Sequence, residues 1–170
     1  MTLGIVVAKD NSKRFPGKNK YLVDNKPLFW HSVEPLLESK NVDDVVVVTD
    51  SKFISNYCFM NEVKVIDRPK NATRDEDKLI NIIRFGYYNL STEYDTVVSV
   101  MANCPGNSVE DIDDAINLLH YEKLREVRSF DSTGKESGIL VLSKSIIQSN
   151  SDISYYQGSI QTLGKEIHYK

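Results

Sequence analysis

A short loop near the amino terminus gathers four positively charged side chains. Between Ala8 and Asn19 the chain carries Lys9, Lys13, Arg14 and Lys18, separated by small and turn-forming residues. This loop follows an apolar run, residues 3–7, that is typical of a buried strand. Because ligands of open α/β sheets bind beyond the carboxyl ends of the strands, this position favours a polyphosphate site over a merely solvated basic loop.

The loop matches neither of the common glycine motifs for phosphates. Gly17-Lys18 lacks the upstream glycine of a P-loop and is followed by Asn19 where that motif has Ser or Thr. The dinucleotide fingerprint needs three spaced glycines, which this loop does not contain. The polyphosphate interpretation therefore rests on charge and on position after the first strand.

Composition limits the partners of the chain. Of its 170 residues 41% are hydrophobic and 26% charged, which is ordinary for a globular domain. The net charge of −3 argues against a nucleic-acid partner, and no apolar run approaches the ~20 residues of a membrane span. The first residues do not resemble a secretion signal, and Cys58 and Cys104 are too few for a disulfide framework. We therefore expect a cytoplasmic location.

Apolar runs alternate with amphipathic stretches along the chain. The runs predict strands at residues 3–7, 45–48, 63–66, 96–100, 126–130 and 138–142, with a polar turn at 131–137 and a last strand near Ile167. Helices are expected from Pro27 with Pro35 kinking or ending the helix, after a cap at 49–51, after a capping box at 73–76, and after Ser108.

This alternation predicts the fold class. Strands that alternate with helices form a mostly parallel sheet covered on both faces. The sequence therefore predicts an α/β protein, a three-layer αβα sandwich, in one domain spanning residues 1–170. No repeat, linker or low-complexity segment divides the chain.

Several stretches resemble one enzyme family. "AKDNSKRFPGKN" and "KPLFWHSVEPLLESKNVDDVVVVTDS" are similar to the opening of the cytidylyltransferases that activate acidic sugars, namely the acylneuraminate and octulosonate synthetases. "RPKNATRDEDK" and "NCPGNSVEDIDDAI" continue the resemblance, which covers roughly the first 120 residues. It implies a Rossmann-like nucleotide-diphospho-sugar transferase fold. It also implies transfer of CMP from CTP, or of another nucleotide from its triphosphate, to an acidic sugar or small polyol, with release of pyrophosphate and dependence on Mg²⁺.

The resemblance also suggests roles for residues of the basic loop. Lys9 stands where the family has an arginine at the triphosphate, and Lys13 and Lys18 match lysines that contact phosphates, so these three are the expected catalytic residues. Asn19 matches an asparagine close to the nucleotide. Nucleotide contacts are also expected of Ala8, Ser12 and Arg14, although Ser12 and Arg14 could equally make only turn and solvent contacts.

Residues after later strands could complete the site. Asp50 ends the four-valine strand and is either a helix cap or a nucleotide contact. Arg68 resembles the family's Arg-Pro near the base or ribose, and Asn103 could line the site from the loop after the fourth strand. Met101 stands where the sialate enzymes carry a glutamine, which leaves the base selectivity open.

No metal ligand is assigned from the sequence. Asp75, Glu76 and Asp77 favour the amino terminus of a helix over a metal cluster. His31, His120 and His168 lack ligand spacing, so each is expected to be structural, and Cys104 is expected to be a small buried residue.

Departures from the family pattern keep other functions open. A short turn replaces the arm that dimerises family members, which leaves a homodimer open. The usual acidic carboxy-terminal motif is not present, so either the metal site is built otherwise, the chain is a truncated form, or catalysis is lost. The alternative is a catalytically inactive nucleotide-binding or scaffold domain. A glycosyltransferase is a third interpretation, but its Asp-X-Asp belongs at a strand end, whereas Asp111-Ile112-Asp113 opens a helix.

Overall fold

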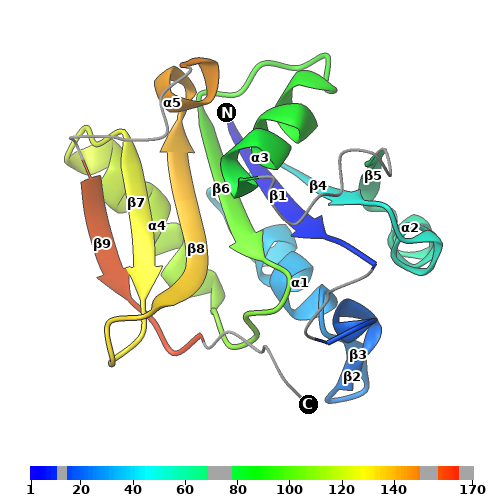
Figure 1. The fold of residues 1–170 in the computed structure, drawn as a ribbon. Helices are drawn as coiled ribbons and strands as arrows, with labels where there is room; N and C mark the ends of the chain where they lie inside the picture. The colour runs from blue at the N-terminus through cyan, green and yellow to red at the C-terminus, as the bar shows by residue number, and fades with distance from the viewer. Residues whose placement is uncertain (11–14, 69–77, 150–156, 165–170) are drawn as a thin grey trace.

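The computed structural model describes residues 1–10, 15–68, 78–149 and 157–164. Its centre is a seven-stranded sheet (Figure 1), whose strands are β1 (Thr2–Ala8), β4 (Asp44–Thr49), β5 (Lys64–Asp67), β6 (Thr96–Met101), β7 (Glu126–Phe130), β8 (Glu136–Ser143) and β9 (Gln157–Gln161). A separate pair, β2 (Leu22–Val23) and β3 (Lys26–Pro27), forms a small antiparallel hairpin beside it.

The strands follow the order β5-β4-β1-β6-β8-β7-β9. Pairing is parallel from β5 to β6 and between β7 and β9, and β8 alone runs against its neighbours, so the predicted mostly parallel sheet is confirmed. The chain crosses from β5 to the other side of β1 when it enters β6, which places the switch in strand order between β1 and β6. Ligands of such sheets bind beyond the strand ends at this switch.

Helices cover both faces of the sheet. The helices α1 (Trp30–Glu38), α2 (Lys52–Met60) and α4 (Val109–Tyr121) pack on one face, and α3 (Leu79–Tyr88) and α5 (Lys144–Gln148) pack on the other (Figure 1). Successive β1 residues alternate between the two layers, since Ile5 belongs to the α3 side and Val6 to the α1 side. The predicted three-layer sandwich is therefore confirmed.

Close approach of α3 to the sheet depends on a glycine. A Cβ atom on Gly86 would lie 2.9 Å from Val48 Cγ2 and 3.5 Å from Ile5 Cδ1. These contacts are with fully buried side chains, which have little room to move. Gly86 thus lets α3 lie directly against β1 and β4.

The first helix begins later than the sequence predicts. Pro27 pairs with Leu22 in the hairpin, so the helix expected from Pro27 begins only at Trp30. A proline is compatible with both structures because its fixed φ suits extended chain as well as a helix start. Pro35 lies inside α1, and the helix ends at Glu38 within one turn of it.

The helix caps are only partly as predicted. Ser108 and Asp111 form a capping box at the start of α4, which confirms the predicted cap. Ser51 occupies the N-cap position of α2, but its side chain makes no capping bond. The capping box expected at residues 73–76 lies outside the described residues.

The carboxy-terminal strands differ in extent from the prediction. The turn predicted to end at Ser137 ends earlier, because β8 begins at Glu136. The last described strand is β9, which pairs with β7, and the strand expected near Ile167 falls outside the described residues.

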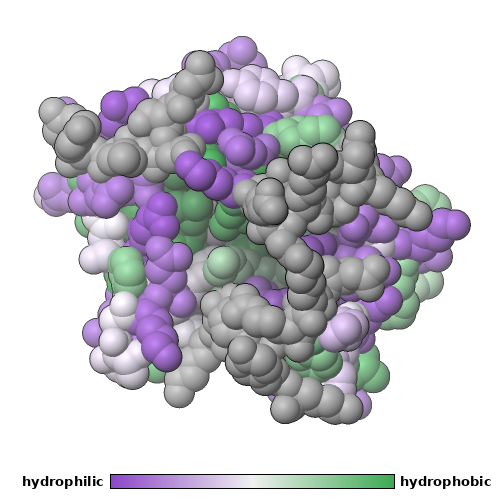
Figure 2. Space-filling model, viewed as in Figure 1, coloured by the Kyte–Doolittle hydropathy of each residue, from purple (hydrophilic) through white to green (hydrophobic). Residues whose placement is uncertain are grey.

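The molecular surface is mostly hydrophilic on the face that carries α3. Figure 2 shows a hollow near the centre of this face, with a hydrophobic floor and hydrophilic residues at its edges. Among the described residues, no helix combines the length and the apolar character needed to cross a bilayer.

Candidate functional site

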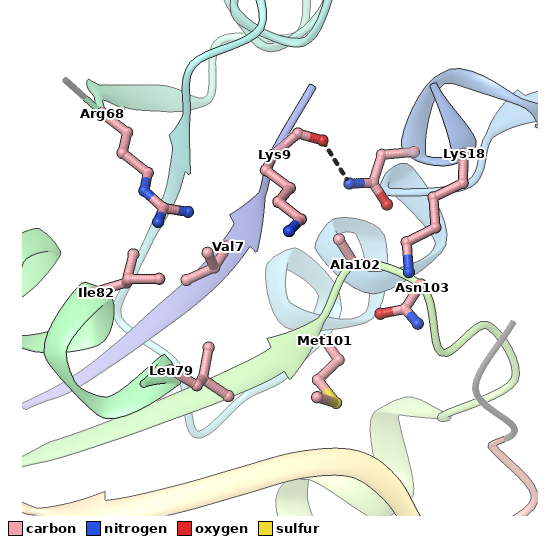
Figure 3. A pocket seen from close by; sticks show the side chains of 10 residues that line it. Val7, Lys9, Lys18, Arg68, Leu79, Ile82, Met101, Ala102 and Asn103 are labelled. Carbon is pink, nitrogen blue, oxygen red and sulfur yellow. Dashed lines mark hydrogen bonds between the residues drawn. The ribbon is translucent and has the colours of Figure 1, made fainter. Parts of the chain in front are cut away.

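A pocket of about 240 Å³ opens at the carboxyl ends of β1 and β6, at the switch in strand order. Ten described residues line it (Figure 3): Val7, Lys9, Lys18, Asn19, Arg68, Leu79, Ile82, Met101, Ala102 and Asn103. They come from the ends of β1, β5 and β6, from the short 3₁₀ turn Lys18–Lys20 and from α3. Segments far apart in the sequence therefore meet at one cavity.

Three cations from different segments reach this pocket. Lys9 follows β1, Lys18 opens the 3₁₀ turn, and Arg68 follows β5. Arg68 is only 6% exposed, and its backbone N–H donates to Thr49 O at 2.8 Å, which holds its segment beside β4. Figure 3 shows Lys9 and Arg68 directed into the pocket and Lys18 reaching down beside Asn103. Such convergence suits a ligand with several negative charges.

Asn19 lies between the loop and the pocket. Its Nδ2 donates to Lys9 O at 2.9 Å, which ties the 3₁₀ turn to the end of β1. The side-chain oxygen of Asn19 is buried and has no hydrogen-bond partner among the described residues. A buried acceptor in a pocket wall normally finds a donor, and a bound ligand can supply one.

Asp10 joins the start of the basic loop to Lys20, just beyond the end of the loop, and to two residues that follow β4. We call this set of contacts the Asp10 latch. Its carboxylate pairs with Lys20 Nζ at 2.8 Å and accepts from Ser51 Oγ at 2.9 Å. The backbone N–H of Asp10 donates to Asp50 Oδ1 at 2.7 Å. The hydrogen bond from Lys20 is the main cause that lowers the pKa of Asp10 below its ordinary value, so the latch is ionised at neutral pH.

This latch also corrects the helix-cap interpretation of Asp50. Ser51 holds the N-cap position, and Asp50 accepts the backbone N–H of Asp10. Asp50 is not among the residues that line the pocket. Because Ala8 pairs with Thr49, β1 and β4 end together, and this register places Asp10 beside Asp50.

The remaining predicted site residues lie elsewhere. Ala8 is fully buried in the core and does not line the pocket. Ser12, Lys13 and Arg14 lie outside the described residues, and so do Asp75, Glu76 and Asp77. The predicted residues that the structure brings together are Lys9, Lys18, Asn19, Arg68 and Asn103.

An apolar wall completes the pocket. Leu79 and Ile82 of α3 face it, together with Met101 at the end of β6. From the sequence, Leu79 and Ile82 could be assigned only to the apolar face of a helix. Helical periodicity does not reveal which residues of that face extend past the sheet and border a pocket. An apolar surface beside cations suits a flat base or a sugar face next to phosphates.

Hydrogen bonds hold the loop after β6 in place. Asn107 Nδ2 donates to Ser137 O at 2.9 Å, and Asn107 Oδ1 accepts from Thr162 Oγ1 at 3.1 Å. Gly138 has a φ of +101°, and a Cβ there would lie 2.7 Å from Cys104 Sγ. The loop that carries Asn103 is thus fixed against β8, and the predicted burial of Cys104 is confirmed.

The described histidines make structural contacts. His31 Nε2 lies 2.8 Å from Val23 O, and His120 Nε2 lies 2.8 Å from Thr96 Oγ1. Neither is among the residues that line the pocket, and His168 is outside the described residues.

A metal ion implied by the resemblance finds no ready set of ligands in the described part of the chain. No group of three or more His, Cys, Asp or Glu side chains there is arranged to hold one. Asp10 and Asp50, the carboxylates next to the basic loop, are engaged with Lys20, Ser51 and the backbone of residue 10. No step of the chemistry is therefore assigned to a metal held by these residues.

Sequence comparisons agree with this geometry. Residues 3–160 match the family model described as "Cytidylyltransferase". The chain is 29% identical over 120 residues to a CMP-N,N'-diacetyllegionaminic acid synthase of Legionella pneumophila, which covers 68% of the chain and 52% of that protein. It is 30% identical over 126 residues to a 3-deoxy-manno-octulosonate cytidylyltransferase of Thermodesulfovibrio yellowstonii, and this match covers 72% of the chain and 49% of that protein. The chain thus spans about half the length of these relatives.

Solved structures share the fold. A CMP:2-keto-3-deoxy-manno-octonic acid synthetase complexed with CTP superposes with a TM-score of 0.81 at 13% identity, covering 99% of this chain and 93% of that one. A cytidylyltransferase from Leptospira borgpetersenii gives a TM-score of 0.71 at 18% identity, and the match covers 99% of this chain and 79% of that one. The family model spans nearly all of the strands and helices described above, and the chain belongs to the cytidylyltransferase family.

Proposed function

We propose that this protein transfers CMP from CTP to a hydroxyl group of an acidic sugar or small polyol and releases pyrophosphate. The observation that carries the proposal is the convergence of Lys9, Lys18 and Arg68 on one pocket at the strand-order switch. Membership of the cytidylyltransferase family supports cytidine as the base. Relatives named for legionaminic acid, octulosonate and acylneuraminate support an acidic sugar as the acceptor.

In the proposed reaction no protein group needs to form a covalent bond with the substrate. The acceptor oxygen attacks the α-phosphorus, the bond to the bridging oxygen of the β-phosphate breaks, and the hydroxyl proton passes to solvent. The protein must align the two oxygens and stabilise the negative charge that grows on pyrophosphate. Lys9 and Lys18 are proposed to bind the triphosphate, with Lys13 and Arg14 from the same loop. Asn19 Oδ1 is proposed to accept from a ribose hydroxyl or from the cytosine amine.

Mg²⁺ is proposed to enter with the nucleotide, bound to its phosphate oxygens, where it would neutralise charge on the leaving group. A structural neighbour, Rv0371c of Mycobacterium tuberculosis, is described as a complex with manganese. A homodimer and the expected cytoplasmic location are also only proposals.

The test is CTP binding and pyrophosphate release by the wild type and by Lys18→Ala. A lost hydrogen bond to a charged group weakens binding by roughly 1.5–3 kcal/mol, so the CTP dissociation constant should rise roughly 10- to 150-fold. Calorimetry measures the binding. A coupled pyrophosphate assay measures turnover with each nucleoside triphosphate and with legionaminic acid, octulosonate or acylneuraminate as the acceptor. The assay is run with and without EDTA.

Lys40→Ala is the matched control, because Lys40 is exposed and is not among the residues that line the pocket. It should leave CTP binding unchanged. Equal affinities of the wild type and Lys18→Ala would refute the assignment of this pocket. Tight CTP binding without turnover of any acceptor would select the inactive nucleotide-binding domain instead.

A further inference from the structure

The helix α2, which lies beside the edge strand β5 (Figure 1), has two apolar faces. Its inner face packs Ile54 and Cys58 into the core. On the outside it carries Phe53, Phe59 and Met60, whose exposed fractions are 44%, 84% and 71%. Single apolar side chains on a surface are ordinary, but three of them gathered on one face of a short helix mark a candidate interaction surface.

The outward face of α2 is centred on Asn56. On an α-helix, the residues three and four positions before and after a given residue are its neighbours on the helix surface. Around the exposed Asn56 these neighbours are Lys52, Phe53, Phe59 and Met60, and all of them are exposed. We call these five residues the α2 outer face. The two phenylalanines stand at equal distances before and after Asn56, so the face is symmetric about this residue.

This symmetry suits pairing with a second copy of the same face. A two-fold axis makes the same patch of both subunits meet, so that patch must be complementary to itself. In an antiparallel pair of α2 helices with the axis at Asn56, Phe53 of each copy would lie opposite Phe59 of the other. The two Asn56 amides would meet at the axis, and each offers a donor and an acceptor to the other. One Asn within an otherwise apolar contact is a known means of fixing the register of paired helices.

Charge at the two ends of α2 favours the antiparallel direction. Lys52 is the first residue of the helix, where the helix dipole disfavours a cation. The carboxyl end of a helix carries partial negative charge, and the exposed Glu62 follows closely after Met60. Antiparallel pairing would bring each Lys52 to the negative end of the other helix. Parallel pairing would instead place the two lysines side by side.

We propose that the α2 outer face is the surface on which a second copy of this chain docks, in an antiparallel two-fold pair centred on Asn56. The inference is independent of the proposed function. Five residues on each side are few beside the roughly 20–30 of a stable interface, so the dimer should be weak and reversible. These five residues are not among those that line the pocket at the ends of β1 and β6, so pairing leaves that pocket accessible.

A disulfide at the axis tests the arrangement. In Asn56→Cys the new thiols of two copies would face each other, whereas the native Cys58 and Cys104 are both buried. Oxidation with diamide should convert most of this variant into a covalent dimer on a non-reducing gel. Tyr121→Cys is the control, since Tyr121 is 85% exposed on α4, and it should stay mostly monomeric. Equal cross-linking of the two variants would overturn the proposal.

Sedimentation velocity over a range of concentrations tests the apolar contact without oxidation. The wild type should pass from monomer to dimer as its concentration rises. Phe59→Ser should weaken the dimer about tenfold or more, because both copies of a central aromatic side chain leave the contact. Tyr121→Ser should dimerise like the wild type, and circular dichroism checks that both variants are folded. A wild type that is monomeric at every concentration, or a Phe59→Ser variant that dimerises equally well, would overturn the proposal.

Charge reversal tests the antiparallel direction. Lys52→Glu alone and Glu62→Lys alone should each weaken the dimer, because each puts like charges at both ends of the pair. The double variant Lys52→Glu/Glu62→Lys restores opposite charges and should recover dimerisation relative to either single variant. Failure of the double variant to recover would contradict antiparallel pairing.

Discussion

Asn19 is one residue whose position could be predicted only in part. Its place after the basic loop and its resemblance to a family asparagine put it near the nucleotide, and it does line the pocket. The bond from its Nδ2 to Lys9 O joins two chain segments, which no local pattern reveals. Lys9 and Lys18 were predictable from charge and position. Leu79 and Ile82 were not, since an apolar helix residue looks the same whether it faces a core or a pocket.

The thiol of Cys58 should resist modification in the folded protein. Cys58 is fully buried in α2, and burial raises the pKa of its thiol to about 12. Because the thiolate is the reactive form, Ellman's reagent at pH 8 should leave Cys58 unmodified in the native state and react promptly in urea. A Cys104→Ala variant leaves Cys58 as the single thiol. Rapid modification of that variant without urea would show that α2 opens readily.

At the scale of elements, the ends of β1 and β4 hold the start of the basic loop in place. The sequence predicted both strands and a helix cap at residues 49–51, and it left Asp50 as either part of that cap or a nucleotide contact. Asp50 accepts instead from the backbone of Asp10, and Ser51 donates to the Asp10 carboxylate. Both contacts depend on which strands are neighbours, and sequence patterns within one element contain no information about that order.

The Asp10 latch should contribute stability that depends on pH. Its folded pKa is lowered, so the carboxylate's contribution is complete above the pKa of unfolded aspartate, 3.8, and is lost as pH falls through the lower folded value. Asp10→Asn should reduce the free energy of unfolding at pH 7 by about 0.5–1 kcal/mol, since its ion pair with Lys20 is partly exposed.

Urea unfolding at a series of pH values measures this effect. The difference between wild type and Asp10→Asn should shrink as the pH falls from 3.8 through the lower folded pKa, because the carboxylate takes up a proton first in the unfolded state and only then in the folded state. Asp24→Asn is a suitable control, since Asp24 is an exposed turn residue of the hairpin. A difference that is constant across this pH range would contradict an ionic latch.

At the scale of the molecule, alternating strands and helices were enough to predict the layered fold. They could not predict that β8 runs against its neighbours or that β9 pairs with β7, since strand order is set by tertiary packing. We propose that residues 1–170 form a single domain. Urea unfolding followed by circular dichroism and by Trp30 fluorescence should then give coincident transitions, because Trp30 lies in a core that α1, α2 and α4 share. Two separate transitions would contradict one domain.

The reversed direction of β8 determines where residues can be inserted into the chain without breaking a strand. Since β7 runs in the same sense as β6, the turn between β7 and β8 lies at the ligand-bearing edge of the sheet (Figure 1). Gly134 in this turn has open space around it, and no strand would have to be broken to lengthen the segment. Extra residues added here would lie at the same edge of the sheet as the pocket, so this turn is the natural place to insert a segment that covers the site.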